Sequence, residues 1–419
     1  MTLAPEVAPV GAHPGDGVDV LELYRRHLGA GRSMLGSVMG GITEVGSAGA
    51  YVIGADGRRF LDVGGYGVFI LGHRHPRVVR ALHRQLDTHP LATRTLLSGG
   101  LADAAGALAA AAPDGLERVY FGCTGAEAVE TAFKLARANG KRRIVAMRGA
   151  FHGKTLGALA ATDRLAFQQP FKPLLPGVEF VPYGDVAALA DALAAGDPAV
   201  VIVEPVQGEG GVRIPPDGYL AGVLAACRSA GALLVVDEIQ TGLGRLGTLW
   251  GWDVPGQCPD LLLVGKALGG GCLPVSAVVA TAAAFAPLDR NPRLHSSTFS
   301  GYPLGAAAVS ATLRVLQEER IPQRAAELGE RIGALVRDAV SGLDGVREVR
   351  SRGLLLGVDF AAPAIAGRFS SALLSAGVIA TPSLGADTVV RLTPPAVLDE
   401  DDLRWLATAL RSAAAALSD

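Results

Sequence analysis

The sequence reads Leu233-Leu234-Val235-Val236-Asp237 at one place and Leu261-Leu262-Leu263-Val264-Gly265-Lys266 at another. Each stretch is a short apolar run that ends in an ionisable side chain, and such a run is typical of a strand buried on both faces of a parallel sheet. Open sheets of this kind bind their ligands at the carboxyl ends of the strands. We therefore expect Asp237 and Lys266 to lie near each other at that edge.

An acid and an amine in this arrangement suit a particular cofactor. Pyridoxal 5′-phosphate (PLP) binds proteins through a Schiff base with a lysine, and a carboxylate beside its pyridinium nitrogen makes the ring a better electron sink. Burial would lower the pKa of Lys266, as an imine-forming amine requires. Two plainer interpretations remain open: Asp237 is a turn former or helix cap, and Lys266 is a surface lysine at a strand end.

The bulk composition excludes several classes of protein. The chain has 419 residues, of which 49% are hydrophobic and 19% charged, and its formal net charge is −2. This predicts a globular protein long enough for two domains, without a nucleic-acid partner. The four cysteines show no disulfide-type or zinc-type spacing, so we expect no metal site and a cytoplasmic location. No secretory signal or membrane span is visible in the sequence.

The chain is expected to have three parts. Residues 1–60 form an N-terminal arm and a segment that packs with the small domain, residues 61–310 a large cofactor-binding domain, and residues 311–419 a small α+β domain. Strand and helix patterns alternate in the second part, which predicts an α/β fold with a mostly parallel sheet flanked by helices. The predicted strands of that part, besides the two opening runs, are 118–121, 143–147, 178–181 and 199–203, and its helices include 126–138 and 219–230. Outside it we expect strands at 41–45, 50–53, 346–349, 353–360 and 388–392, a turn at 54–57, and helices at 323–340 and from about 399.

Further candidate residues follow other strands. The turn at 121–128 joins a strand to a helix, and Gly125 and Ala126 would bind a phosphate through backbone N–H groups, with the Thr124 hydroxyl as a further donor. An ordinary strand–helix turn would look the same. Phe151 follows another strand, so it either stacks on the pyridine ring or belongs to the core. Gln240, three residues after Asp237, is expected to reach the phenolic oxygen of the cofactor.

A second group of charged residues could recognise the substrate. Glu204 and Glu209 follow the strand at 199–203, although either could be a plain loop charge. Arg391 is a cation within an apolar strand, and a buried arginine usually has an anionic partner. A substrate carboxylate and Glu209 are the competing candidates for that partner.

Taken together, these segments resemble the class III, fold-type I, PLP-dependent aminotransferases, the ornithine aminotransferase-like or ω-aminotransferase family. The most specific strings are residues 237–245 and 265–271, and residues 65–76, 150–159 and 171–177 support them. The similarity runs from about residue 35 to the C-terminus, and within the family the chain looks most like the putrescine aminotransferases. The resemblance implies a large domain with a mostly parallel, seven-stranded type of sheet and a smaller α+β domain.

The resemblance also implies a role for each site residue. Lys266 would form the Schiff base, Asp237 would bind the pyridinium and Gln240 the phenolic oxygen. The remaining cofactor residues would be Thr124, Gly125, Ala126, Phe151, His152, Glu204 and Thr298, of which Thr298 would reach the phosphate in the neighbouring subunit of a homodimer with shared active sites. Arg391 would bind the α-carboxylate of glutamate or 2-oxoglutarate, Glu209 would pair with Arg391 when the substrate lacks that carboxylate, and Tyr66 would contact the distal end of the substrate.

Two positions depart from the family pattern. The family phosphate turn Asn-Ser-Gly-Thr-Glu-Ala reads Cys-Thr-Gly-Ala-Glu-Ala at residues 123–128, so one hydroxyl has moved or gone. After Thr298 the usual Gly-Gly-Asn-Pro reads Ser-Gly-Tyr-Pro, which introduces the bulky Tyr302. Both changes bear on the substrate rather than on the chemistry.

The expected activity is a ping-pong transamination between a terminal amine, such as putrescine, and a keto acid, such as 2-oxoglutarate. One alternative runs the same chemistry toward an aldehyde or ketone of specialised metabolism, with Ile70 and Tyr302 reshaping the pocket. An acetylornithine- or ornithine-type aminotransferase, a PLP aminomutase, a decarboxylating relative and a catalytically silent binding protein also stay open.

Overall fold

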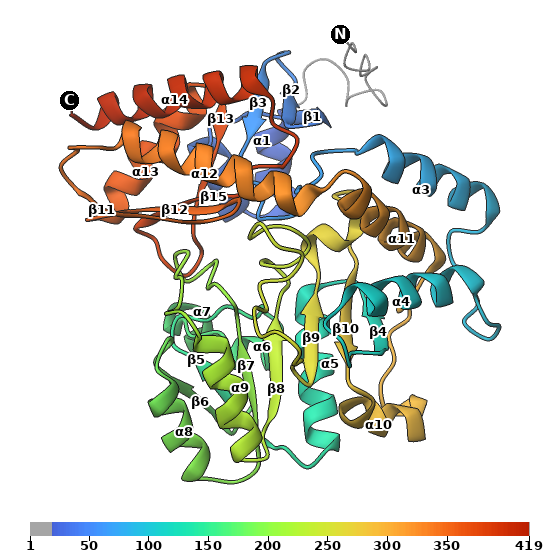
Figure 1. Ribbon diagram of the computed structural model, residues 1–419. Helices are drawn as coiled ribbons and strands as arrows, with labels where there is room; N and C mark the ends of the chain where they lie inside the picture. Colours follow the sequence, from blue (N-terminus) through green and yellow to red (C-terminus); the bar gives the residue numbers. More distant parts are fainter. Residues whose placement is uncertain (1–18, 419) are drawn as a thin grey trace.

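The computed structural model describes residues 19–418, and the part of the N-terminal arm predicted before residue 19 lies outside them. Figure 1 shows a large sheet flanked by helices in the lower half of the view, with two smaller sheets and the C-terminal helices above it. Within the described residues, no helix is long and apolar enough to cross a membrane. All four cysteines are free thiols.

The large sheet has seven strands in the order β4-β10-β9-β8-β7-β5-β6. Their bounds are β4 Arg118–Gly122, β5 Arg143–Met147, β6 Val178–Val181, β7 Ala199–Val203, β8 Leu233–Asp237, β9 Leu261–Val264 and β10 Ser276–Ala280. The pairs β5–β6, β5–β7, β7–β8 and β8–β9 are parallel, so the α/β fold with a mostly parallel sheet is confirmed.

Strand β10 is the strand of this sheet that the sequence analysis did not predict. It runs antiparallel to both β4 and β9. Its apolar run continues into the alanine-rich residues 281–286 without a Gly, Pro or Asn to mark its end, so no turn signal separates it from the helix that follows. Because β10 runs the other way, β4 points in the same direction as the parallel strands, and its carboxyl end reaches the same edge.

Helices cover the large sheet on both faces. Those in the central part of the chain are α5 Gly125–Ala138, α6 Leu156–Ala160, α7 Leu165–Gln168, α8 Val186–Ala194, α9 Tyr219–Ser229 and α10 Ala282–Arg290, with short 3-10 turns η2 Gln169–Phe171, η3 Lys266–Gly269 and η4 Pro292–Leu294. Two further helices, α3 Pro76–Thr88 and α4 Gly99–Ala111, each pack against α11 Pro303–Glu318. Successive residues of β8 enter different clusters, because Leu234 and Val236 join one hydrophobic core and Val235 the other. The run 233–236 is therefore buried on both faces, as its composition predicts.

The two smaller sheets contain the N- and C-terminal segments. One has the order β1-β2-β3-β13 and the other β11-β12-β15-β14. The bounds are β1 Glu44–Ala48, β2 Tyr51–Gly54, β3 Arg59–Asp62, β11 Val346–Arg352, β12 Leu355–Phe360, β13 Val378–Ile379, β14 Thr381–Pro382 and β15 Val389–Leu392. The associated helices are α1 Val20–Leu23, the π-helical η1 Tyr24–Leu28, α2 Ala30–Val38, α12 Ile321–Ala339, α13 Pro363–Ser375 and α14 Glu400–Ser418. Strand β3 pairs in parallel with β13, which joins the N-terminal segment to the C-terminal one.

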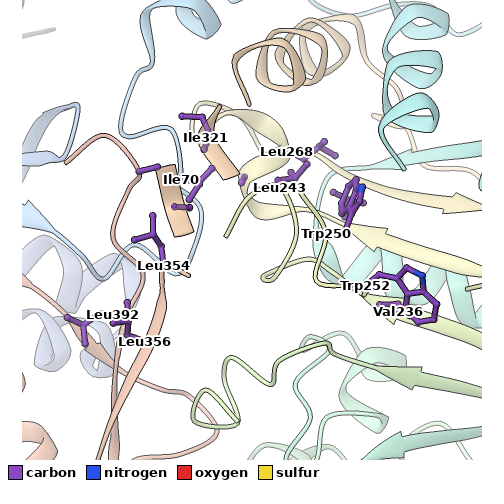
Figure 2. Packing of buried hydrophobic residues seen from close by; sticks show 14 of the residues in the cluster. Ile70, Val236, Leu243, Trp250, Trp252, Leu268, Ile321, Leu354, Leu356 and Leu392 are labelled. Atoms are coloured by element: carbon purple, nitrogen blue, oxygen red, sulfur yellow. The ribbon is translucent and has the colours of Figure 1, made fainter. Parts of the chain in front are cut away.

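A continuous hydrophobic core joins the large sheet to the C-terminal elements. It includes Trp250, Trp252, Leu354 and Leu356, all buried and drawn in Figure 2. Ile70 is 1% exposed in the same core, so the expectation that it reshapes a substrate pocket is wrong. In the sequence, an isoleucine in the hydrophobic core cannot be distinguished from one that lines a pocket.

Replacement of Leu354, which is fully buried in this core, tests how much the junction contributes to stability. Leu354→Ala should lower the free energy of unfolding by about 2–5 kcal/mol, because the change leaves a cavity that its neighbours cannot fully close. The measurement is urea unfolding of the protein followed by tryptophan fluorescence. Leu86→Ala, at a half-exposed position of α3, is the control, and an equal loss in both variants would contradict the assignment of Leu354 to a tightly packed core.

Candidate active site

The functional side chains gather at the carboxyl edge of the large sheet. Lys266 follows β9, Asp237 ends β8 and Glu204 follows β7, and these three strands are neighbours. The loop after β5 adds Phe151 and His152. Together with the turn that begins α5, they enclose a cavity of about 200 Å³. The residues that line it are Gly125, Ala126, Phe151, His152, Gly153, Glu204, Glu209, Asp237, Ile239, Gln240 and Lys266.

Lys266 is confined by the backbone around it. Its φ of 45° lies in the left-handed region, which a residue with a side chain adopts only where the surroundings impose it. Burial lowers the pKa of Lys266 to about 8, while the charges of Glu209 and Asp237 oppose the change. The amine is therefore partly neutral close to physiological pH, the form that attacks a carbonyl.

Asp237, His152 and Glu204 form a buried polar group. Nδ1 of His152 lies 2.7 Å from Oδ2 of Asp237, and the backbone N–H of Ile239 donates to Oδ1 at 3.0 Å. Burial alone would lower the pKa of His152, but the hydrogen bond and the charge of Asp237 outweigh it and raise that pKa above its ordinary value. Burial raises the pKa of the Glu204 carboxyl to about 7, although the His152 charge acts in the opposite direction.

The turn between β4 and α5 has the form of an anion site. Helix α5 has 14 residues and begins at Gly125, so the N–H groups of its first turn have no partner within the helix. Thr124 is the N-cap, and its hydroxyl accepts a hydrogen bond from the N–H of Glu127. Thr124 thus stabilises the helix start without lining the cavity. A side chain at position 125 would approach Ile239 to 3.0 Å, so the backbone lies close to the cavity wall.

Two glycines, Gly208 and Gly67, lie next to the Gln240 side chain. A Cβ at Gly208 would lie 1.8 Å from Oε1 of Gln240, so position 208 must be glycine for Gln240 to keep this place. At Gly67, whose φ of 77° favours glycine, a Cβ would lie at an ordinary contact distance of 3.4 Å from Cγ of Gln240. Nε2 of Gln240 is buried and has no hydrogen-bond partner in the described part of the chain, which leaves a donor available for a ligand oxygen.

Arg391 and Glu209 form a buried ion pair beside this cavity. Nη1 of Arg391 donates to Oε1 of Glu209, and both side chains are almost fully buried. Among residues 19–418, Nε and Nη2 of Arg391 have no partner. Burial alone would raise the pKa of Glu209, but the charges of Arg391 and Lys266 outweigh it and lower that pKa below its ordinary value. The Arg391 guanidinium also lies 5.7 Å from the centre of the Tyr66 ring.

The structure thus places nine of the predicted site residues around one cavity, with Arg391 and Tyr66 next to it. Thr298 does not line the cavity and is exposed on the protein surface. Tyr302 is also outside it, and its hydroxyl donates to the carbonyl of Pro274. The sequence analysis missed Ile239 and Gly153, which line the cavity without a chemical signal of their own.

The residues present fit PLP. Lys266 provides the amine, Asp237 the carboxylate, Gln240 an unpaired buried donor and the start of α5 the phosphate site. Within the described residues there is no group of three or more His, Cys, Asp or Glu side chains that could hold a metal ion.

Comparisons with known proteins identify the family of this chain. The model of the family "Aminotransferase class-III" matches residues 39–414. An ornithine aminotransferase from Toxoplasma gondii, whose structure shows partial occupancy of PLP at the active site, is 32% identical with a TM-score of 0.86, over 96% of this chain and 99% of that one. The ornithine δ-aminotransferase of Plasmodium falciparum is 29% identical (TM-score 0.80; 98% and 96% covered). An (S)-enantioselective ω-transaminase from Thermomicrobium roseum is 28% identical (TM-score 0.84; 97% of each chain covered). The chain therefore belongs to the class-III aminotransferases and is a PLP-dependent transaminase of fold type I, as the sequence resemblance implied.

Proposed function

We propose that this enzyme moves an amino group from a terminal amine, such as the diamine putrescine, to a keto acid, such as 2-oxoglutarate, in a ping-pong reaction. The observation that carries the proposal is the buried Arg391–Glu209 pair beside Lys266. A ping-pong transaminase accepts two unlike substrates in turn in one pocket. When an internal carboxylate neutralises the cation, the pocket accepts an amine that has no carboxylate. When that carboxylate turns away, the free cation can bind the carboxylate of a keto acid.

The chain's own residues divide the work. PLP, when bound, supplies the electron sink for the carbanionic charge that develops on the substrate carbon. Lys266 would hold the cofactor covalently and, once released, its Nζ would accept the proton from the substrate carbon that carries the amine. Asp237 would keep the pyridine nitrogen protonated, and His152 and the N–H of Ile239 orient its carboxylate. Phe151 would stack on the ring, and the backbone of Gly125 and Ala126 would hold the phosphate.

Substrate recognition would depend on Arg391 and Glu209. With a diamine, which has no carboxylate, Glu209 stays on Arg391 and the buried guanidinium remains neutralised. With 2-oxoglutarate, Glu209 turns away and Arg391 binds the α-carboxylate through two N–H groups. Tyr66, half-exposed and close to Arg391, would contact the distal end of the substrate.

Separate half-reactions test this proposal, because each substrate alone changes the visible band of the bound cofactor in a ping-pong reaction. Arg391→Gln should lower kcat/KM for 2-oxoglutarate about 100-fold, since it removes charge-assisted hydrogen bonds worth about 3 kcal/mol. Glu209→Gln should instead weaken the half-reaction with putrescine, because it leaves Arg391 buried without a counter-charge. Lys266→Ala is the negative control and should lose both half-reactions.

The same assay separates the alternatives. If no diamine changes the band while bulkier amines do, the donor is a different one and the physiological direction is the amination of an aldehyde or ketone. Ornithine or acetylornithine as the best donor would indicate the ornithine-type alternative. An aminomutase would turn over without any keto acid, which would contradict the proposal.

The raised pKa of Glu204 predicts a pH-dependent stability of the cofactor-free protein. The pKa is about 7 in the folded protein and about 4.5 for an unperturbed glutamate. The folded state thus binds this proton more tightly, so the stabilisation is complete below about pH 4.5 and is lost as the pH rises through 7. Glu204→Gln stays neutral and still accepts the hydrogen bond that Phe151 N–H donates at 3.0 Å.

The measurement is the melting temperature of the variant and the wild type between pH 5 and pH 8. The advantage of Glu204→Gln over the wild type should increase with pH across this range. Glu330→Gln, at an exposed position of α12, is the control and should show no such trend. A constant difference at every pH would contradict a displaced titration of Glu204.

We further propose a cytoplasmic homodimer in which Thr298 of one subunit completes the phosphate site of the other. Thr298 is exposed, and so is Phe299, which follows it directly. Leu96 and Leu97, which are 79% and 104% exposed, line one surface pocket with Ser300, two residues after Thr298. Exposed apolar patches of this kind mark interaction surfaces.

The dimer predicts two measurable properties. Light scattering during gel filtration should give twice the chain mass of 42.9 kDa. Thr298→Ala should raise the dissociation constant of PLP about tenfold, as expected for the loss of one charge-assisted hydrogen bond, while the mass stays that of a dimer. A monomer that binds PLP as tightly as the dimer would contradict the proposal.

A further inference from the structure

Residues 162–164, directly after α6, connect the cofactor loop to the C-terminal part of the chain. The Thr162 hydroxyl accepts the backbone N–H of His152 at 2.9 Å, and Oδ2 of Asp163 accepts the N–H of Gly149 at the same distance. The Asp163 N–H in turn donates to the carbonyl of Ala150 at 2.9 Å. These bonds attach the segment rigidly to the loop that carries Phe151 and His152.

Arg164 extends from this rigid segment to residues 383–387 of the loop between β14 and β15. Its Nη1 donates to the carbonyl oxygen of Gly385 at 3.0 Å, and its Nη2 forms an ion pair with Oδ2 of Asp387 at 2.6 Å. A single guanidinium therefore binds the loop at two points, one on the backbone and one on a side chain. Neither Arg164 nor Asp387 lines the cofactor cavity.

The loop 383–387 holds Glu209 in turn. The N–H of Leu384 donates to Oε2 of Glu209 at 2.9 Å, and the N–H of Gly385 donates to the Glu209 carbonyl at 2.9 Å. A Cβ at Gly385 would lie 2.6 Å from that carbonyl oxygen, so the two backbones are in direct contact. The Glu209 carboxylate is thus bound at both oxygens, by Arg391 on one side and by Leu384 N–H on the other.

We propose that the Arg164–Asp387 pair is a positioning device that sets how readily Glu209 leaves Arg391. The pair holds the loop, the loop holds the Leu384 N–H, and that N–H stabilises Glu209 in the orientation that neutralises Arg391. The inference rests on the proposed exchange of Glu209 for a substrate carboxylate. It assigns control of the balance between the two substrate classes to residues outside the cavity.

The direction of the effect follows from the contacts. Without the Arg164 contacts the loop is less ordered, the Leu384 hydrogen bond weakens and Glu209 leaves Arg391 more easily. Recognition of the keto acid improves, because less free energy is needed to free Arg391. Recognition of an amine without a carboxylate becomes weaker, because the neutralised form of Arg391 is less populated. A general loss of structure would weaken both half-reactions together.

The size of the effect is limited by solvent exposure. The Arg164 side chain is 30% exposed and that of Asp387 58%. Exposed ion pairs shift an equilibrium by a factor of up to about five. We therefore expect changes of about two- to five-fold in each half-reaction, in opposite directions, and a smaller effect of Arg164→Gln at high salt than at low salt.

The experiment measures the two half-reactions of the PLP-loaded enzyme in Arg164→Gln, Asp387→Asn and the double variant. Each single variant should lower kcat/KM for putrescine and raise it for 2-oxoglutarate. The double variant should resemble the single ones, because both changes break the same bridge. Arg164→Lys, which keeps the charge, should lie between the wild type and Arg164→Gln.

Two further measurements make the test specific. Hydrogen exchange of a peptide covering residues 383–387 in the cofactor-free protein should be faster in Arg164→Gln than in the wild type. Arg331→Gln breaks an exposed ion pair with Glu400 of similar length, 2.7 Å, and is the matched control. It should alter neither the exchange of that peptide nor the ratio of the two half-reactions.

The outcomes are distinguishable. If Glu209→Gln shifts the ratio and Arg164→Gln does not, the positioning role is wrong and the proposed function stands. Parallel losses in both half-reactions of Arg164→Gln also overturn the positioning role. If neither Glu209→Gln nor Arg164→Gln shifts the ratio, the exchange at Arg391 is absent and both proposals fail.

Discussion

The burial of the Lys266 amine next to several other charges is the constraint on which the rest of the site depends. An ammonium without water and without a partner is too costly to keep, so its pKa falls to about 8 and carboxylates gather near it. Glu209 and Asp237 are among the groups that act on this amine, and Arg391 is a second cation in the same set. Next to these groups the backbone passes so close to Gln240 that position 208 has no room for a side chain, and at position 67 a left-handed φ of 77° favours glycine.

The two ends of this charged group come from different parts of the chain. Asp237 ends a strand of the large sheet and Lys266 and Glu209 follow two others, whereas Arg391 lies in β15 of a smaller sheet. One hydrophobic core that contains Trp250, Leu354 and Leu356 packs the elements around the two sheets together. The Arg391–Glu209 pair therefore joins residues of the two sheets, whereas Lys266 and Asp237 both belong to the large sheet. In the functions proposed above, this separates substrate choice from the covalent chemistry.

Sequence patterns predicted those parts of the fold that depend on the apolar or polar character of neighbouring residues. The apolar runs 233–236 and 261–264 form neighbouring strands because all-apolar stretches of that length are buried on both faces, and parallel strands bring their ends to one edge. Strand β10 was missed because an alanine-rich helix follows it without a turn residue. Ile70 was assigned to a pocket, although it lies in the core, since hydrophobicity alone does not tell a packed position from a pocket wall. Ile239 and Gly153 line the cavity because the folded backbone places them there, and neither residue type indicates a functional site in the sequence.

By itself, the sequence indicated the cofactor, because an acid and an amine at the ends of two buried strands, together with a glycine-rich turn before a helix, suit PLP. The reaction class came from the resemblance of the longer motifs in the sequence to the class III aminotransferases. The sequence also marked Glu209 and Arg391 as possible partners. The tertiary structure decided that they do pair, that Asp237 is held by His152, and that the loop 383–387 reaches Glu209. These contacts join residues 85 to 182 positions apart. Only the packing of the sheets brings such residues within hydrogen-bond distance, and no local pattern encodes that packing.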